Sequence, residues 1–449
     1  MELLWNNMQI IIPPTTIVDK IIGQQKRKEG QLPLRLLTYV IQQPVEDGLL
    51  IYNTLTLCLV WLNKEEAQHF MELDELYELW FLVPDGHNDK KLCKQVKSMA
   101  MLFEKKNTGM DNFVILPTSD CNARCFYCFE KNAAHIHMSR ETAERVAQFI
   151  VRQQNNDIHI RWFGGEPLYN VQIIDVICQK LKDSGIKLTS TMVSNGYLFD
   201  DNIIQRAKKL WNLKTIQITL DGTEEIYNRS KRYIYKEGSA YQRVLENIGK
   251  LTAAEIKVSI RLNVDKHNID NMFTLVRELY GRFGENKQLT IYSHVLFDYV
   301  DNHAKRTKDE RDELYMRRME LEQLIKDCHY HAKNKLKKTL KLHHCMADND
   351  RSALISPNGY LGKCEHFVDS DFFGHVDSDE RNQQVIQQFK ERHEEETRCD
   401  YCAFYPKCNR IKRCPSGGMC SSDKQEEYIH RMTEGMLEEY KDYINNHAQ

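Results

Sequence analysis

The sequence predicts an α/β protein, with a partial (β/α)6 barrel of the TIM type between a winged-helix-like α+β domain and a C-terminal cysteine-rich domain. Two observations favour this division. Between about residues 112 and 298, six strand-like segments alternate with amphipathic helical segments, as a parallel sheet with right-handed crossovers requires. Ten of the 14 cysteines lie in two groups, at 121–128 and 345–420. The domains we expect are residues 1–105, 106–299, 300–342 and 343–449.

Length and composition limit the class of protein. A chain of 449 residues is too long for one typical core and predicts several domains. Its 41% hydrophobic and 28% charged residues are typical of globular proteins. The net charge of −2 gives no reason to expect nucleic acid or an anionic membrane as a partner, and no apolar run reaches the roughly 20 residues that span a bilayer. Because no basic residues precede the short apolar stretch at the N-terminus, we expect a cytoplasmic protein without a secretory signal.

The first 105 residues predict a small domain of strands and helices. Residues 47–63 are typical of two short strands with a turn near residues 52–54. Residues 64–83 favour a helix, and residues 84–106 favour a turn followed by another helix. The alternative is an N-terminal extension that only covers one end of the barrel.

The central part of the chain predicts the barrel itself. Amphipathic stretches such as residues 139–154 and 200–211 predict helices between the strands. In barrels of this kind, the functional residues lie on loops at the C-terminal ends of the strands. The predicted strands are FVILPT (113–118), DIHIRWF (157–163), KLTSTMV (187–193), KTIQITL (214–220), KVSIRLNV (257–264) and QLTIYSHVLF (288–297).

The rest of the chain predicts a helical bridge and a loop-rich domain. Residues 300–342 are strongly charged and contain neither proline nor glycine, which favours one or two solvent-facing helices. The cysteines from residue 343 onward lie in a loop-rich stretch, and an acidic helix is expected after them.

The first group of cysteines follows the first barrel strand with the spacing Cys121-x3-Cys125-x2-Cys128. In a reducing compartment, such cysteines are better candidates for metal ligands than for disulfides. Three thiolates on one loop can bind three irons of a cubane cluster and leave the fourth iron open, unlike an ordinary four-cysteine ferredoxin site. Zinc is the alternative, and it would need a fourth ligand such as His135 or His137.

The spacing, with the aromatic Tyr127 before the last cysteine, resembles the signature of the radical S-adenosylmethionine (SAM) superfamily. The resemblance implies a [4Fe–4S] cluster whose open iron chelates the amino and carboxylate groups of SAM. In that family an electron from the cluster cleaves SAM, and the resulting 5′-deoxyadenosyl radical abstracts a hydrogen atom from the substrate. An electron donor such as flavodoxin or ferredoxin is implied as a partner.

The end of the second predicted strand supports this resemblance. Gly164, Gly165 and Glu166, followed by Pro167, resemble the GGE motif of the family, which meets the amino group of SAM. Glycines permit close backbone approach, and a carboxylate can receive an ammonium group. We therefore expect this segment to bind SAM.

Three further strand ends resemble SAM-binding segments of the family. Ser194, in Ser-Asn-Gly, and Thr219, in Thr-Leu-Asp-Gly, end the third and fourth predicted strands and would face the ribose and carboxylate. Arg261 lies near the end of the fifth strand, where its cation could pair with the SAM carboxylate or form a structural ion pair. Tyr127 would lie close to the adenine, with its backbone as the contact.

The order of the seven C-terminal cysteines resembles the SPASM extension, which binds two auxiliary [4Fe–4S] clusters in peptide-modifying radical SAM enzymes. Five residues separate Cys408 from Cys414 where the family usually has three, so the sequence departs from the pattern there. A zinc-ribbon domain is the alternative. The resemblance assigns one cluster to Cys345, Cys364 and Cys414, with Cys328, His343, His344 or a substrate thiolate available as a fourth ligand, and the other to Cys399, Cys402, Cys408 and Cys420.

The SPASM resemblance implies a peptide or protein substrate. The N-terminal domain resembles the element with which maturases of ribosomally made peptides (RiPPs) bind a leader peptide as an added strand. We therefore predict a peptide maturase that installs an intramolecular crosslink, with a cysteine thioether to carbon as the leading hypothesis. A substrate thiolate would capture the carbon radical left by hydrogen abstraction, while iron accepts the surplus electron. The alternatives are a carbon–carbon crosslink, formylglycine formation in a sulfatase, and a non-enzymatic zinc-binding scaffold or redox sensor.

Overall fold

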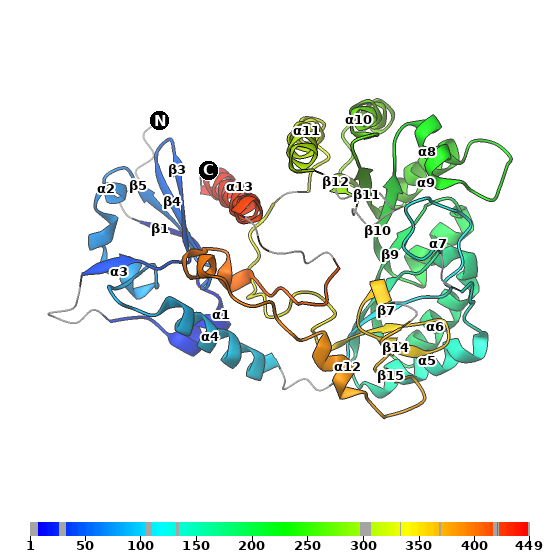
Figure 1. The fold of residues 1–449 in the computed structure, drawn as a ribbon, viewed down its shortest axis with the longest axis horizontal. Coiled ribbons are helices and arrows are strands. Elements are labelled where there is room, and N and C mark those ends of the chain that lie inside the picture. Colours follow the sequence, from blue (N-terminus) through cyan, green and yellow to red (C-terminus); the bar gives the residue numbers. More distant parts are fainter. Residues whose placement is uncertain are drawn as a thin grey trace. The chain divides into compact units, whose positions relative to one another are not determined.

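The computed structural model divides the chain into two compact units (Figure 1). Unit 1 contains residues 1–108, 333–348 and 389–449, and unit 2 contains residues 109–332 and 349–388. Within the described residues, no helix is both long enough and apolar enough to cross a membrane. The structure describes all residues except 1–7, 27–32, 105–108, 132–133, 297–306, 333, 368–369, 416–419, 421 and 448–449.

Unit 2 contains the predicted barrel strands. Six consecutive strands pair in parallel in the order β12-β11-β10-β9-β8-β7, which confirms the α/β barrel fold. Beyond β7 the sheet continues with three strands that we did not predict, of which β13 pairs in parallel with β7. The strands are β7 (Asn112–Ile115), β8 (Asp157–Trp162), β9 (Lys187–Ser194), β10 (Leu213–Leu220), β11 (Lys257–Val264), β12 (Leu289–Val295), β13 (Ser352–Ile355), β14 (Tyr360–Gly362) and β15 (Gly374–His375).

Helices connect these strands and cover one face of the sheet (Figure 1). Two begin at capping residues, since Ser139 accepts a hydrogen bond from Thr142 N and Asp200 accepts one from Ile203 N. Alternate strand residues, such as Ile160 in β8, are buried against the helices. The helices are α5 (Arg140–Arg152), α6 (Val171–Asp183), α7 (Asp201–Lys209), α8 (Glu224–Lys231), α9 (Ala240–Ala253), α10 (Ile269–Phe283), α11 (Lys308–Asp327) and α12 (Gln383–Gln388), with single 3-10 turns at Pro167–Asn170 and Glu365–Phe367.

Unit 1 is built on an antiparallel sheet of strand order β1-β5-β4-β3. The two strands predicted within residues 47–63 are confirmed as β4 and β5, whereas the others were not predicted. A second small sheet pairs β2 with β6. The strands are β1 (Gln9–Ile12), β2 (Leu34–Leu36), β3 (Val40–Val45), β4 (Gly48–Asn53), β5 (Leu59–Asn63) and β6 (Leu82–Pro84), and the helices before residue 105 are α1 (Thr16–Ile22), α2 (Glu66–His69), α3 (Asp74–Glu78) and α4 (Asp89–Glu104), with a 3-10 turn at Phe70–Glu72.

The single helix predicted over residues 64–83 is wrong. This stretch breaks into α2, a 3-10 turn and α3, and then forms strand β6. Trp80 has a φ of +64°, which no helix tolerates, and Phe81, Leu82 and Val83 are completely buried. Because pairing with β2 buries this continuous apolar run, tertiary packing overrides the local helical pattern.

The predicted acidic C-terminal helix is confirmed as α13 (Ser422–His447), and it packs on one face of the N-terminal sheet. Met432, Met436 and Tyr440 lie in one buried cluster with Tyr52 and Trp61 of the sheet. The two ends of the chain therefore form one folding unit. In its described residues, the cysteine-rich segment of this unit has the two 3-10 turns Thr397–Tyr401 and Tyr405–Lys407 before α13.

Candidate functional site

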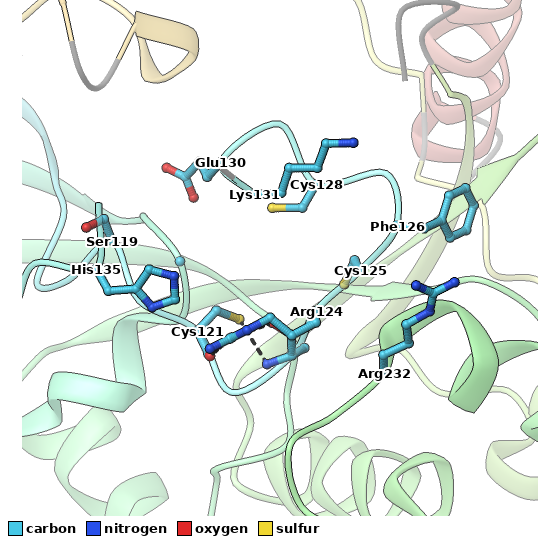
Figure 2. A pocket seen from close by; sticks show the side chains of 12 residues that line it. Ser119, Cys121, Arg124, Cys125, Phe126, Cys128, Glu130, Lys131, His135 and Arg232 are labelled. Carbon is cyan, nitrogen blue, oxygen red and sulfur yellow. Dashed lines mark hydrogen bonds between the residues drawn. The ribbon is translucent and has the colours of Figure 1, made fainter. Parts of the chain in front are cut away.

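The loop after β7 places three cysteines around one cavity of unit 2. Cys121, Cys125 and Cys128 line a space of about 370 Å³ together with Gly165 from the loop after β8 and Arg232 from the end of α8 (Figure 2). These loops all leave the carboxyl ends of parallel strands or their following helices. The cavity therefore lies where a barrel of this kind has its functional residues.

Main-chain hydrogen bonds hold the cysteine loop in place. Arg124 N donates to the carbonyl oxygens of Lys231, at 2.9 Å, and Arg232, at 3.2 Å, and Ile234 N donates to Asn122 O at 3.0 Å. Arg232 lies in the left-handed region, with a φ of +50°. The chain thus turns sharply after α8, so that residues 231–234 run alongside the cysteine loop.

A buried ion pair between Lys231 and Asp221 contacts Tyr127 of the same loop. Lys231 Nζ lies 3.3 Å from Asp221 Oδ2 and donates to the hydroxyl of Tyr127 at 2.7 Å. The Tyr127 hydroxyl in turn donates to Asp221 Oδ2 at 2.7 Å, and Asn263 Nδ2 donates to Asp221 Oδ1 at 3.2 Å. Lys231 and Asp221 are only 4% and 2% exposed. Because these charges are paired and hydrogen-bonded, they can remain buried beside the cysteines.

The three thiols lie in an environment that disfavours their charged form. Burial raises the pKa of Cys121 to about 12 and that of Cys128 to about 11, and it also raises the pKa of Cys125. Ligation of a metal would therefore displace protons from these thiols. As the side chains stand, no three Cys, His, Asp or Glu side chains of the described residues come close enough to one another to hold a metal ion.

The histidines that could complete a zinc site contact an acidic residue. His135 Nδ1 lies 2.5 Å from Asp120 Oδ1, and His137 Nε2 lies 3.6 Å from Asp120 Oδ2. Asn122 is fully buried, and its side-chain Nδ2 has no hydrogen-bond partner within the described structure. Three soft thiols around one cavity fit a sulfur-rich cluster with an open iron, and the unsatisfied Asn122 donor lies in the same loop.

The two glycines at the end of β8 allow their loop to approach the cysteine loop. A Cβ on Gly165 would lie 2.1 Å from Asp120 O, and a Cβ on Gly164, whose φ is +108°, would lie 2.3 Å from Thr118 O. Gly165 N donates to Thr118 O, and Glu166 N donates to Asp120 O at 2.9 Å. Any side chain here would force the loops apart.

Glu166 is fully buried and accepts three hydrogen bonds. Its Oε1 accepts from Ser194 Oγ at 2.8 Å and from Leu168 N at 3.2 Å, and its Oε2 accepts from Asn195 N at 2.8 Å. Burial raises its pKa to about 7, although these hydrogen bonds oppose the shift. Such a carboxylate would be stabilised by a positively charged group bound beside it.

Two other residues predicted to contact SAM, Thr219 and Arg261, lie on neighbouring strands of the sheet. Thr219 of β10 stands beside Arg261 of β11 in the parallel register, and both are half-buried. Arg261 Nε donates to Asn263 Oδ1 at 2.9 Å, and its Nη2 lies 2.9 Å from His294 Nδ1. Burial and the Arg261 charge lower the pKa of His294 to about 4, so both partners are neutral near pH 7. The Arg261 cation can therefore pair with an incoming carboxylate.

Sequence reasoning missed several residues of this site. Asn195 Nδ2 donates to Asn122 Oδ1 at 2.6 Å and lies 3.8 Å from Cys121 Sγ. Both asparagines adjoin residues that we had singled out, so proximity to the motifs was the available signal. Lys231, in contrast, ends a short charged helix, and nothing in its sequence context indicates that it is buried.

Four of the C-terminal cysteines belong to one stretch of unit 1, in which Cys402 N donates to Cys399 O at 3.5 Å and Arg398 Nη1 donates to Cys420 O at 3.1 Å. Burial raises the pKa of Cys402, and the charges of Cys408 and Cys420 raise it further. Burial also raises the pKa of Cys420, with a contribution from Cys399. The four thiols assigned to one auxiliary cluster are thus near enough to influence one another.

The cysteines assigned to the other auxiliary cluster are divided between the units. Cys345 and Cys414 belong to unit 1, and Cys364 belongs to unit 2. Cys328, considered as a fourth ligand, is buried at the end of α11 in unit 2. His343, another candidate, lies 2.8 Å from Glu104 Oε2 through its Nε2. The ligand set of this cluster remains a prediction from the cysteine order.

Three thiols, close-approach glycines and a buried carboxylate thus lie at the carboxyl edge of a parallel (β/α) domain, where such domains have their functional residues. Residues 115–279 match the radical SAM superfamily. This part of the chain is therefore similar to radical SAM domains, and the similarity implies a [4Fe–4S] cluster and SAM as cofactors.

Similar proteins include enzymes and peptide-bound structures. The radical SAM cyclopropyl synthase TigE of Paramaledivibacter caminithermalis is 22% identical over 278 residues, which are 51% of this chain and 58% of TigE. The chain spans about half the length of the curated relatives it matches.

Two solved structures share the fold. One is native anSMEcpe with bound AdoMet and Cp18Cys peptide, at a TM-score of 0.54 and 14% identity over 75% of this chain and 99% of that one. The other is Streptococcus suis SuiB bound to precursor peptide SuiA, at a TM-score of 0.52 and 13% identity over 84% of this chain and 95% of that one. At these identities the likeness concerns the fold alone.

Proposed function

We propose that this protein is a radical SAM peptide maturase, which installs an intramolecular crosslink in a ribosomally made precursor peptide. A cysteine thioether to carbon is the leading product, and a carbon–carbon crosslink is the alternative. The observation that supports the radical chemistry most directly is the cavity lined by Cys121, Cys125 and Cys128 beside the buried carboxylate of Glu166. The cysteine-rich segment and the N-terminal sheet in the same chain support a peptide substrate.

The residues of the site take complementary roles in this proposal. The three cysteines of the β7 loop hold the [4Fe–4S] cluster, which when bound supplies the electron that cleaves SAM to methionine and a 5′-deoxyadenosyl radical. Glu166, with Gly164 and Gly165 beside it, receives the SAM ammonium group, and Arg261 pairs with the SAM carboxylate. The other SAM contacts are Ser194, Thr219 and the backbone at Tyr127.

The orientation of Tyr127 agrees with a backbone contact. Its hydroxyl points to Lys231 and Asp221, where it forms two hydrogen bonds. The Tyr127 side chain therefore helps to hold the cysteine loop in place. Its main chain, between two of the cysteines, is the part that could face adenine.

The remaining partners follow from the same proposal. Two auxiliary [4Fe–4S] clusters on the C-terminal cysteines would serve the peptide chemistry, and a flavodoxin or ferredoxin would supply electrons. The leader peptide would add a strand to an edge of the N-terminal sheet, whose edge strands are β1 and β3. A cytoplasmic location suits these clusters, because thiols stay reduced there.

Leader dependence is best tested on the peptide rather than by removing the N-terminal domain. Deletion of residues 1–105 would strip the sheet from α13 and expose the apolar cluster around Met436, so it would damage the C-terminal segment as well. A short cysteine-containing peptide encoded next to this protein should be offered with and without its leader region. We expect a loss of two hydrogen masses and of one free thiol in the full-length peptide only.

The alternatives give different products in this assay. A carbon–carbon crosslink loses two hydrogen masses but retains every thiol. A sulfatase-type reaction replaces the cysteine sulfur with an aldehyde oxygen and should not need a leader, so efficient conversion of a leaderless sulfatase peptide would contradict the maturase proposal. Similarity to a cysteine-type anaerobic sulfatase-maturating enzyme of Clostridium novyi, at 23% identity over 203 residues, makes that comparison necessary.

The raised pKa of Glu166 predicts a specific pH dependence in the metal-free protein. Its carboxyl titrates near 7 in the fold and near 4.5 ordinarily, so the folded state retains a proton that the unfolded state loses. Stability should therefore fall as pH rises from about 4.5 to 7, by up to about 3 kcal/mol. Urea unfolding at pH 5 and pH 8 should show this fall in the wild type and a much smaller one in Glu166→Gln.

The exposed Glu141 of α5 provides the matched control, since Glu141→Gln should keep the wild-type pH dependence. Equal pH dependence in Glu166→Gln and the wild type would contradict the burial argument. With SAM and the cluster present, Glu166→Gln should weaken SAM binding by about tenfold or more, as expected for loss of a charged hydrogen bond.

A further inference from the structure

The N-terminal part of unit 1 holds the segment that contains Cys399, Cys402 and Cys408. This segment contains two short 3-10 turns but no α-helix or strand, so contacts with other elements help to fix its path. Hydrogen bonds join it to the N-terminal residues: Thr54 Oγ1 donates to Ala403 O at 2.5 Å, and Lys407 Nζ donates to the Tyr52 hydroxyl at 2.7 Å. The rings of Tyr39 and Tyr405 stack with their centroids 6.0 Å apart. Lys90 and Lys94 form ion pairs with Glu395 at 2.9 and 3.0 Å.

One of these contacts reaches a cysteine directly. Lys97 extends from helix α4, and its Nζ donates to Asn409 Oδ1 at 2.7 Å and approaches Cys408 O at 3.4 Å. Asn409 is itself buried and donates through Nδ2 to Lys341 O at 2.7 Å. Lys97 therefore contacts the main chain at Cys408 and the side chain of the residue that follows it.

The charge of Lys97 has no carboxylate partner among its contacts in the described structure. Both of its hydrogen-bond acceptors are neutral oxygens. Lys407, next to Cys408, donates to the Tyr52 hydroxyl and lies over the Tyr52 ring. Both lysines are only partly buried, and two cations close to Cys408 would stabilise an anionic group bound there.

A four-thiolate iron–sulfur cluster is such a group, and it gains one more negative charge when it is reduced. Nearby positive charge and hydrogen bonding favour the reduced form, since net charge and hydrogen bonds set the potential of these clusters. Cys408 is one of the four cysteines that the proposed function assigns to such a cluster.

We propose that Lys97 is a positioning residue through which the N-terminal domain raises the reduction potential of the cluster held by Cys399, Cys402, Cys408 and Cys420. This inference rests on the proposed function, because it requires that cluster. Its consequence is that the domain expected to bind the leader also prepares this cluster to accept an electron from the peptide chemistry. Removing the ammonium group should make the cluster harder to reduce.

The test uses full-length protein in which this cluster is isolated by Cys121→Ala, Cys125→Ala, Cys128→Ala and Cys364→Ala. After anaerobic reconstitution, a titration with dithionite followed by electron paramagnetic resonance gives the midpoint potential. In Lys97→Met, we expect the equilibrium constant for one-electron reduction to fall about tenfold, which corresponds to 59 mV. Lys91→Met, which changes an exposed lysine of the same helix, should leave the potential unchanged.

Two further variants separate charge from packing. Lys97→Gln removes the charge but can still donate a hydrogen bond, so it should lower the potential as Lys97→Met does, whereas Lys97→Arg should stay near the wild type. If Lys97→Met and Lys97→Gln lose the cluster while Lys97→Arg keeps it, a role for the charge is also supported. Loss from all three variants, or equal potentials in all of them, would overturn the inference. A background protein without any iron would instead refute the proposed auxiliary cluster.

Discussion

Replacing Cys125 with alanine is expected to abolish reductive cleavage of SAM. Cys125 is the middle one of the three cysteines proposed to hold the cluster, and two thiolates cannot hold a cubane cluster firmly. Production of 5′-deoxyadenosine under reducing, anaerobic conditions should therefore fall by at least about a thousandfold, an activation free energy of about 4 kcal/mol. Iron content should fall by about four from the roughly ten to twelve irons expected of three clusters.

A second cysteine variant controls for the loss of a buried thiol. Cys178 lies in helix α6 and is 1% exposed, away from the cysteine cavity. Cys178→Ala should reduce stability by about 1 kcal/mol and retain SAM cleavage and iron content. Continued 5′-deoxyadenosine formation by Cys125→Ala, or a colourless, zinc-loaded wild-type protein, would refute the radical SAM assignment of this site.

Replacing Lys231 with methionine is expected to have the largest effect on folding stability. Its ammonium group pairs with Asp221 and donates to Tyr127, and its removal would leave the Asp221 carboxylate buried without its cation. Breaking a buried ion pair by removing one partner costs about 3–5 kcal/mol. Urea unfolding of the metal-free protein should show this loss, and iron incorporation should fall because the cysteine loop loses its support.

Two comparisons identify the cause of that loss. Lys231→Met combined with Asp221→Asn should recover part of the stability, because the amide carries no charge and can still hydrogen-bond with Tyr127 and Asn263. Lys236→Met changes an exposed lysine nearby and should alter stability by less than about 0.5 kcal/mol. A Lys231→Met protein as stable as Lys236→Met would show that the ion pair contributes little.

The cysteine loop and the Gly-Gly-Glu segment could be found from the sequence, because both are short and their residue types are restricted by chemistry. The close approach of Gly165 to Asp120 O explains why a side chain is excluded there. The contacts of Lys231 and Asn195 could not be predicted from the sequence. Their roles depend on contacts with Asp221 and Asn122 across the barrel edge, and sequence spacing does not determine such contacts.

The amino-acid sequence by itself determined the alternation of strands and helices from β7 to β12, since hydrophobic periodicity is a local property. It likewise determined which thiols share a loop. Only the tertiary structure decided that residues 64–83 break into short helices and a strand, that α13 packs on the N-terminal sheet, and that Lys97 reaches Cys408. Each of these depends on burial between segments distant in the chain, where the free energy of packing outweighs local preference.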